Sequence, residues 1–251
     1  MAHPTPDEEE RYLAAHIADL KRLSIKSGIP RFSAFLNERE AAVAARAVKG
    51  EPVFYGGYDG AARTVCGFFE DTYAEDLEKR ELFPICAVTF TFRKCDNPTH
   101  RDFLGALLAL EIKRELLGDI LVAEDYAVVF CHETARELVF RMNKIGSVGV
   151  SAELGATRPI PEVKTKRIEA AVSSLRLDCI VSAAANISRE RSASLIKSGQ
   201  VNADFFPCLN LSREISAGTV ISVRGSGRYR LSEISGETKK GRIRVVIEKY
   251  I

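Results

Sequence analysis

Basic side chains are concentrated in the last third of the chain, where their number suits contact with a polyanion. From Lys164 to Ile251 the sequence holds 16 Lys and Arg against 8 Asp and Glu, a net charge of +8. Residues 1–163 hold 20 against 26, a net charge of −6. Clustered cations bind nucleic acid because they displace the counterions condensed along its phosphates. A solvated charged surface on an ordinary domain is the alternative, and charge alone leaves both interpretations open.

Three segments carry these cations away from the apolar side chains. Ser188 predicts the N-cap of a helix over 189–197, which ends before Gly199. The cations of this helix, Arg189, Arg191 and Lys197, lie off its apolar side. The segment 224–228, Arg-Gly-Ser-Gly-Arg, places two cations beside a flexible backbone that can closely approach a sugar-phosphate chain. In a strand predicted over 242–247, residue alternation puts the two arginines on one face and the apolar residues on the other.

Three other clusters could do catalysis or bind a phosphate, but each has a simpler structural explanation. Cys131-His132 are neighbours in sequence, yet adjacent residues of a strand point to opposite faces. The cluster Gly56-Gly57-Tyr58-Asp59-Gly60 lacks the spacing of a P-loop or a dinucleotide fingerprint, so it predicts a turn. In His100-Arg101-Asp102, the carboxylate stands where it would cap the helix that begins after Thr99.

Composition limits the class of protein. With 251 residues, of which 46% are hydrophobic, the chain can bury a sizeable core and divide into two or three units. No apolar run is long enough to span a bilayer, and Asp7-Glu8-Glu9-Glu10 is the opposite of a basic signal-peptide start. We expect a cytoplasmic protein with no metal, no cofactor and no catalytic residue. The cysteines, which are dispersed and predict free thiols in a reducing compartment, are Cys66, Cys86, Cys95, Cys131, Cys179 and Cys208.

The pattern of apolar residues and turn signals predicts an α+β protein with three regions: an N-terminal region over 1–82, a central domain over 83–165 and a C-terminal domain over 170–251. In the first region the predicted elements are a helix from the capping box Thr5-Pro6-Asp7-Glu8 to Gly28, a second helix from the cap Asn37 to Gly50, and two strands with a turn between Val53 and Phe69.

The central domain has the order β-α-β-β-α-β, which is that of ferredoxin-like and RNA-recognition-type folds. This order alone implies no function. Phe90 and Phe92 could stack on bases, but the signature sequences of that RNA motif are absent, so we assign both rings to the core. The predicted elements are a strand over 84–92, a helix capped by Thr99, strands over 119–122 and 126–130, a helix over 133–143 and a strand over 146–151.

The C-terminal domain, with two short helices and a small sheet, resembles the RNA-binding module named after small-subunit ribosomal protein S-four. The resemblance covers roughly residues 173–231. The residues that carry it are Leu175-Arg176-Leu177-Asp178, Ser188-Arg189, Ala193, Leu195-Ile196, Gly199, Val201 and Val220-Ile221.

Most of the chain resembles the YlmH family, in which this module follows an RNA-recognition-like domain. The supporting segments are Gly56-Gly57-Tyr58, His100-Arg101-Asp102-Phe103-Leu104-Gly105-Ala106-Leu107, Lys113-Arg114-Glu115, Gly118-Asp119-Ile120, 224–228 and Thr238-Lys239-Lys240-Gly241-Arg242. Two residues depart from the family pattern. Glu111 stands where the pattern favours Gly, and Asp204 would bring a negative charge close to the RNA-binding face.

The resemblance implies a bacterial protein that binds structured ribosomal or transfer RNA without modifying it. It also implies association with the large ribosomal subunit, a monomeric state, and links to ribosome-associated quality control and cell division. An RNA-modifying enzyme of the pseudouridine synthase type, docking its substrate through the same module, is the alternative. The residues expected to face RNA are Arg176, Ser188, Arg189, Arg191, Lys197, Arg224, Arg228, Lys239, Lys240 and Arg242.

Overall fold

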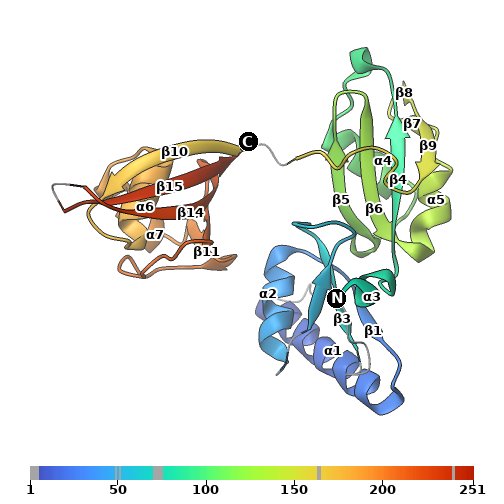
Figure 1. The fold of residues 1–251 in the computed structure, drawn as a ribbon, viewed down its shortest axis with the longest axis horizontal. Coiled ribbons are helices and arrows are strands. Elements are labelled where there is room, and N and C mark those ends of the chain that lie inside the picture. Colours follow the sequence, from blue (N-terminus) through green and yellow to red (C-terminus); the bar gives the residue numbers. More distant parts are fainter. Residues whose placement is uncertain (1–5, 49, 51, 70–75, 163–164, 239–240) are drawn as a thin grey trace. The chain divides into compact units, whose positions relative to one another are not determined.

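The structure is a computed structural model that describes residues 6–48, 50, 52–69, 76–162, 165–238 and 241–251 (Figure 1). The chain divides into two compact units, Met1–Pro161 and Glu162–Ile251. Both combine helices with sheets, so the chain is an α+β protein, as its sequence predicts.

The N-terminal part of the first unit packs helices on a small antiparallel sheet whose strand order is β1-β3-β2. The side chains of Ile17, Ala44 and Cys66 meet in its core. Its elements are α1 (Pro6–Ser27), β1 (Arg31–Leu36), α2 (Glu38–Ala47), β2 (Val53–Tyr55), β3 (Thr64–Phe68) and α3 (Asp76–Glu81).

The predicted cap of α2 is confirmed. The Asn37 side chain accepts hydrogen bonds from the backbone of Arg39 and Glu40, and the Glu40 carboxylate accepts one from the Asn37 N–H at 2.6 Å. The cap predicted at Thr5 lies outside the described residues. The elements β1 and α3 were not predicted. Strand β1 is only six residues long, and it carries no strict polar-apolar alternation because Phe35 and Leu36 are adjacent and both buried.

The central part holds a four-stranded antiparallel sheet of order β5-β6-β4-β9. Helices α4 and α5 cover one face, where Phe103, Leu107 and Val139 pack against Phe90 and Val129. The elements are β4 (Ile85–Thr91), η1 (Lys94–Asp96), α4 (His100–Ala109), η2 (Arg114–Leu116), β5 (Leu117–Val122), β6 (Tyr126–His132), η3 (Glu133–Ala135), α5 (Arg136–Phe140), β7 (Lys144–Ile145), β8 (Val148–Gly149) and β9 (Ser151–Leu154).

The end of this region differs from the prediction. The prediction of a strand over 146–151 is wrong. Gly146, at φ +58°, turns the chain between β7 and β8, and these two short strands pair only with each other. The fourth strand of the sheet is instead β9, which pairs with β4 through Ser151, Ala152 and Glu153. A glycine in the left-handed region favours a tight turn over an extended strand, so the fourth strand starts five residues and ends three residues further along the chain than predicted.

The second unit is a six-stranded antiparallel sheet of order β10-β15-β14-β13-β11-β12 with two helices on one face. Ile180, Leu195 and Ile196 of the helices pack against Leu231 and Ile247 of the sheet. Its elements are β10 (Thr165–Val172), α6 (Leu177–Ala185), α7 (Arg189–Lys197), β11 (Val201–Ala203), β12 (Phe206–Pro207), β13 (Val220–Val223), β14 (Gly227–Glu237) and β15 (Ile243–Tyr250).

Strand β10 was not predicted, and it moves the start of this unit upstream of residue 170. All eight of its residues, Thr165–Val172, pair with β15. Its outward residues are mostly polar or small, so its sequence carries little of the apolar signal that marks a strand.

Candidate nucleic-acid interface

Helix α7 presents cations to solvent because its other side is packed on the core of the second unit. Leu195 and Ile196 are buried, whereas Arg191 and Lys197 are exposed. Neither of these cationic groups has a hydrogen bond or an ion pair with another residue that the structure describes. Both charges are therefore available to a phosphate.

Ser188, predicted among the RNA-facing residues, uses its side chain within the helix. Its hydroxyl oxygen accepts a hydrogen bond from the backbone N–H of Arg191 at 3.1 Å. This is the bond of an N-cap, as the sequence predicts. Gly199, at φ +70°, follows the end of the helix as predicted.

Arg176 and Arg189, predicted as separate phosphate contacts, are joined through one carboxylate. Nε of Arg176 donates to Oδ1 of Asp178 at 3.0 Å, and Nη2 of Arg189 lies 3.4 Å from Oδ2. The Asp178 side chain is 11% exposed, while those of the two arginines are 43% and 58% exposed. One buried negative charge thus holds two partly exposed cations side by side, and the cluster keeps a net positive charge.

The electrostatics of Asp178 agree with this geometry. Burial acts to raise the pKa of its carboxyl group, but the hydrogen bond and charge of Arg176, together with the charge of Arg189, hold that pKa below its ordinary value of 3.8. The carboxylate is therefore ionised at neutral pH. Arg176 and Arg189 stay anchored at the N-terminal ends of α6 and α7.

The turn between β13 and β14 brings Arg224 and Arg228 to the same surface depression, which has a volume of about 550 Å³. Arg224 is exposed, and Arg228 is half-buried. The guanidinium carbon of Arg228 lies 4.9 Å from the ring centroid of Tyr250 and 5.3 Å from that of Phe205. The two rings attract the cation and restrict its position.

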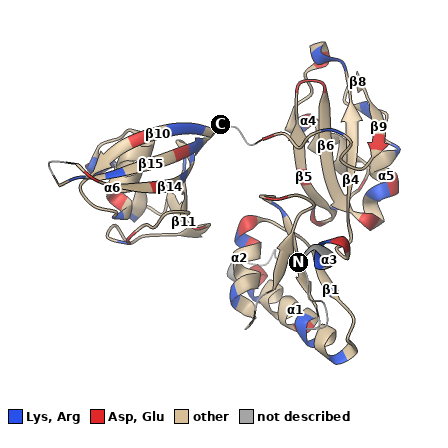
Figure 2. Cartoon of the chain, viewed as in Figure 1, with Lys and Arg blue, Asp and Glu red and all other residues tan. Residues whose placement is uncertain are grey.

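The remaining predicted cations lie near the connection between β14 and β15. Lys239 and Lys240 lie outside the described residues. Arg242 and Arg244 are exposed and Val245 is buried, as the predicted alternation requires, but Val246 and Ile247 are both buried, so the alternation does not continue beyond Val245. Figure 2 shows Lys and Arg recurring along β10 and β15. Arg230, which was not among the predicted residues, is also exposed on β14, two residues after Arg228.

Asp204, one of the two departures from the family pattern, has its charge compensated within the protein. Its carboxylate accepts a hydrogen bond from Arg213 at 2.8 Å and one from the backbone N–H of Val220 at 3.3 Å. Its backbone adopts φ +48°, a left-handed conformation that Asp tolerates better than most residues. The residue therefore stabilises the turn after β11.

Among the described residues of the first unit, the aromatic rings of the four-stranded sheet are either buried against the helices or covered by other parts of the chain. Phe90 and Phe92 face the helices and are buried, which confirms their assignment to the core. On the other face the chain after β9 crosses the sheet: the Thr89 hydroxyl donates to Gly155 O at 2.7 Å and accepts from Thr157 N at 3.0 Å. Tyr126 OH donates to Pro159 O at 2.8 Å.

Asp119 fastens the glycine-rich turn to the central sheet. Its carboxylate accepts hydrogen bonds from Tyr58 OH at 2.8 Å and from the backbone of Ala62 and Arg63. Burial, then the charge and the hydrogen bond of Asp119, raise the pKa of Tyr58, so it stays a neutral donor. Gly57, at φ +99°, lies so close to the Phe130 ring that a Cβ would approach it to 2.3 Å. The glycine cluster is a turn, as predicted.

The segment His100-Arg101-Asp102 is a helix start. The Asp102 carboxylate accepts hydrogen bonds from the backbone N–H of Thr99 at 2.8 Å and from its hydroxyl at 2.7 Å. These bonds lower the pKa of Asp102, so its carboxylate is ionised, and one of its two oxygens, Oδ2, accepts both bonds of the cap. The capping prediction is confirmed.

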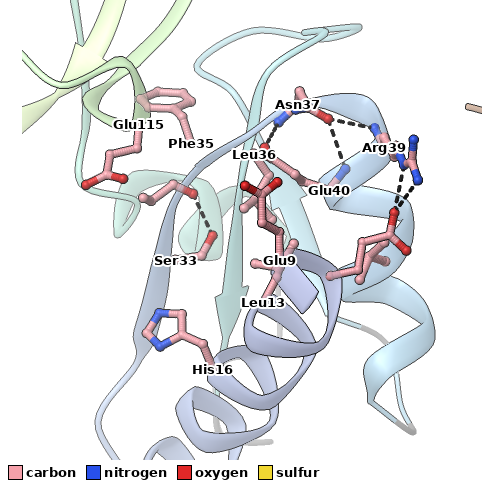
Figure 3. Close-up of a pocket in the computed structure, with 13 residues that line it drawn as sticks. Glu9, Leu13, His16, Ser33, Phe35, Leu36, Asn37, Arg39, Glu40 and Glu115 are labelled. Atoms are coloured by element: carbon pink, nitrogen blue, oxygen red, sulfur yellow. Dashed lines mark hydrogen bonds and ion pairs between the residues drawn. The ribbon is translucent and has the colours of Figure 1, made fainter. Parts of the chain in front are cut away.

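A cavity of about 480 Å³ in the N-terminal part has the wrong charge for RNA (Figure 3). Glu9, Glu40 and Glu115 line it, and the one arginine on its wall, Arg39, pairs with Glu10. Four carboxylates against one guanidinium repel phosphate.

The described residues contain no group of three or more His, Cys, Asp or Glu that could hold a metal ion. Among the same residues, no helix combines the length and apolar character that crossing a membrane requires. The six cysteines carry free thiols, as expected.

Comparison with known proteins identifies related chains. Residues 83–157 match the model of a family described as "Putative RNA-binding domain in YlmH". The chain is 30% identical over 252 residues to the ribosome-associated protein quality control protein P2 of Bacillus subtilis (strain 168), covering 96% of each chain. It is also similar in structure to the cell division protein ylmH from Streptococcus pneumoniae, with a TM-score of 0.50, 19% identity, 63% of this chain covered and 95% of that chain.

These similarities differ in what they establish. At 19% identity, the likeness to the solved structure shows the fold alone. The similarity to the Bacillus subtilis protein extends over nearly the whole of both chains, and the matched domain model lies on the central sheet with its two helices. The chain therefore belongs to the YlmH family.

Proposed function

We propose that this protein binds structured ribosomal or transfer RNA through its C-terminal unit and does not modify it. The observation that carries the proposal is the surface formed by α7 and the Asp178 cluster. The charged groups of Arg191 and Lys197 are exposed and have no partner among the described residues. Arg189, at the start of the same helix, shares the Asp178 carboxylate with Arg176. Because Asp178 already holds Arg176 and Arg189, these two cations lose little freedom when they bind phosphates, whereas Arg191 and Lys197 offer charges that no other described residue compensates.

We further propose that the bound RNA belongs to the ribosome and that the protein works there as a cytoplasmic monomer. The name of the Bacillus subtilis relative links that protein to ribosome-associated quality control, and the name of the Streptococcus pneumoniae protein links that one to cell division. The large ribosomal subunit is the proposed partner.

Replacing both Arg191 and Lys197 with Ala tests the RNA-binding surface. Each lost phosphate contact should flatten the slope of log affinity against log salt by roughly 0.7 to 0.9, so the double variant should lose about 1.5 of slope and bind more weakly. Fluorescence anisotropy with a labelled ribosomal RNA hairpin, over a salt series, measures both quantities. Arg189 is left unchanged because its removal would also disturb Asp178.

The matched control removes two exposed cations from the first unit, Lys26 and Arg31. This variant has the same net charge as the test variant but leaves α7 intact, so its slope and affinity should match the wild type. Equal behaviour of the two variants would mean that total charge, not this surface, governs binding. An unchanged slope in a correctly folded Arg191/Lys197 variant would refute the proposed surface.

RNA modification, the alternative function, would require a nucleophile, and the candidate for that role is Asp102. Asp102 is engaged in the cap of α4 rather than directed at a substrate. We expect no new nucleoside after ribosomal RNA is incubated with the protein and analysed by mass spectrometry. A modified uridine that forms with the wild type and not with Asp102→Asn would establish the enzyme instead.

A further inference from the structure

A row of polar side chains crosses the second unit on the sheet face that the helices leave open. In the strand register, Asn202 of β11 is opposite Ser222 of β13, and Ser222 is opposite Arg228 of β14. Their chain neighbours, Val201, Ala203, Ile221, Val223 and Tyr229, are buried. Because successive side chains of a strand alternate between faces, the three polar residues lie together on the face away from α6 and α7.

This row forms one wall of the depression of about 550 Å³ that also contains Arg224. Binding pockets for small molecules have volumes of roughly 300 to 1,000 Å³, so one nucleotide fits in this space. The turn from α7 to β11 contributes Gly199 and Gln200, and the turn from β13 to β14 contributes Gly225 and Gly227.

Three polar side chains of the depression are available for a ligand. The Asn202 amide, the Ser222 hydroxyl and the Arg224 guanidinium have no hydrogen-bond partner among the residues that the structure describes. An amide both donates and accepts, as does a hydroxyl, so this pair matches the mixed donor and acceptor edge of a nucleobase.

The arginines and glycines of the depression suit the phosphate group that is attached to a nucleotide. The rings of Phe205 and Tyr250 hold the Arg228 guanidinium at this end of the row. Gly225, at φ +79°, has nothing within 4 Å of the position that a Cβ would occupy, so a sugar-phosphate chain can approach its backbone.

We propose that this depression is a pocket for one unpaired RNA nucleotide. Asn202 and Ser222 hydrogen-bond the edge of the base, and Arg224 and Arg228 bind the adjoining phosphate. The inference rests on the proposed function, RNA binding by the C-terminal unit, and adds a class of target: RNA with an unpaired nucleotide next to a helix. Unpaired bases expose their Watson–Crick edges to a protein, whereas in paired bases these edges are occupied by the partner base.

The test compares two RNA hairpins that differ only in one bulged nucleotide, with the full-length protein. The wild type should bind the bulged hairpin about tenfold more tightly than the paired one, the effect of one or two hydrogen bonds. Asn202→Ala combined with Ser222→Ala should remove this preference and leave the affinity for the paired hairpin unchanged. The salt slope should also stay unchanged, because neither side chain is charged.

Two further variants separate the pocket from general effects. Arg224→Ala, at an exposed position, should weaken binding of the bulged hairpin more than that of the paired hairpin. Ser235→Ala, an exposed serine of β14 outside the depression, should behave as the wild type. Thermal unfolding of each variant checks that the unit remains folded.

The outcomes distinguish the pocket from the proposed function. If the wild type binds both hairpins equally, or if the Asn202/Ser222 variant weakens both to the same extent, the pocket is refuted while RNA binding stands. If the wild type binds neither hairpin, the proposed function fails and the pocket fails with it. Preference for the bulge that depends on Asn202 and Ser222 establishes the pocket.

Discussion

The role of each arginine in the second unit depends on which partner its charge already has. Arg176 and Arg189 share the Asp178 carboxylate, and Arg213 compensates Asp204. Arg191 has no such partner among the described residues, so its charge contributes fully to binding an anion. Charge counts along the sequence treat these arginines as equal, but the structure shows that some are held in place and others are available.

Asp178 should make the stability of the second unit depend on acidity. Its pKa is lower in the folded state than the ordinary value of 3.8. A carboxyl group with a lowered folded pKa stabilises the fold above its unfolded pKa of about 3.9, and this contribution disappears as pH falls through the folded value. The wild type should therefore lose stability below about pH 4, and Asp178→Asn should lose less over the same range.

Urea unfolding at pH 7 and at pH 3 measures this difference. At pH 7 the Asn variant should be less stable than the wild type, because Arg176 and Arg189 lose their common counterion. Glu190→Gln, at an exposed position one residue after Arg189, is the matched control and should follow the wild type. A parallel loss of stability in the Asp178→Asn and wild-type proteins would contradict the assigned role.

At the scale of elements, the end of α4 places Glu111 in a backbone conformation that suits glycine. Helix α4 ends at Ala109, and Glu111 follows at φ +59°. This left-handed conformation is common after a helix and costs an ordinary L-residue about 1–2 kcal/mol, whereas glycine adopts it readily. Glu111 therefore stores strain in a turn that glycine would relieve.

Replacing Glu111 with Gly should stabilise the first unit by about 1 kcal/mol, which raises its melting temperature by about 2–4 °C. Glu111→Ala removes the same side chain but keeps a Cβ, so it should not show the gain. Differential scanning calorimetry measures both. A melting temperature that rises equally in the two variants would assign the effect to the lost carboxylate instead of the backbone.

The chain that follows β9 covers the face of the central sheet opposite its helices. Thr89 and Tyr126 hold the chain at 155–159 across the strands, and the Tyr58 ring stacks on Phe130 at 5.0 Å between centroids. A sheet of this topology stacks bases only where its aromatic rings face solvent. The matched domain of the first unit therefore has no open stacking platform on the described sheet faces.

At the scale of the whole molecule, each of the two units has a hydrophobic core of its own. In the second unit Ile180, Ile196 and Ile247 belong to one buried cluster, and in the first unit Phe90 and Leu107 belong to another. A unit with its own core can unfold as one cooperative step. The net charge also differs, at −6 for residues 1–163 and +8 for the rest of the chain.

Removing a buried side chain from one core should therefore destabilise that unit selectively. Ile196→Ala, at a position with 0% exposure, should lower the stability of the second unit by about 2–5 kcal/mol. The protection of amides in β13 and β14 from hydrogen exchange should fall, while that of β4 and β6 should not. Leu107→Ala is the matched change in the first unit and should give the reverse pattern; equal loss in both units would show one cooperative core.

The sequence by itself determined the local features that depend on neighbours in the chain. The caps at Asn37, Thr99 and Ser188 were predicted because a side chain three residues from a backbone N–H can reach it whatever the tertiary structure. The same holds for α7 and for residues 242–245, where exposed and buried positions follow from the periodicity of one element.

Only the tertiary structure decided which distant residues meet. The pairing of Asn202 with Ser222 and Arg228 depends on strand register, and a shift of one residue would put these side chains on the opposite face. Asp178 likewise joins Arg189 across eleven residues because α6 packs against α7. Helix periodicity fixes which side of α7 is polar, but packing of apolar surfaces far apart in the chain sets the contacts that make those polar groups a site.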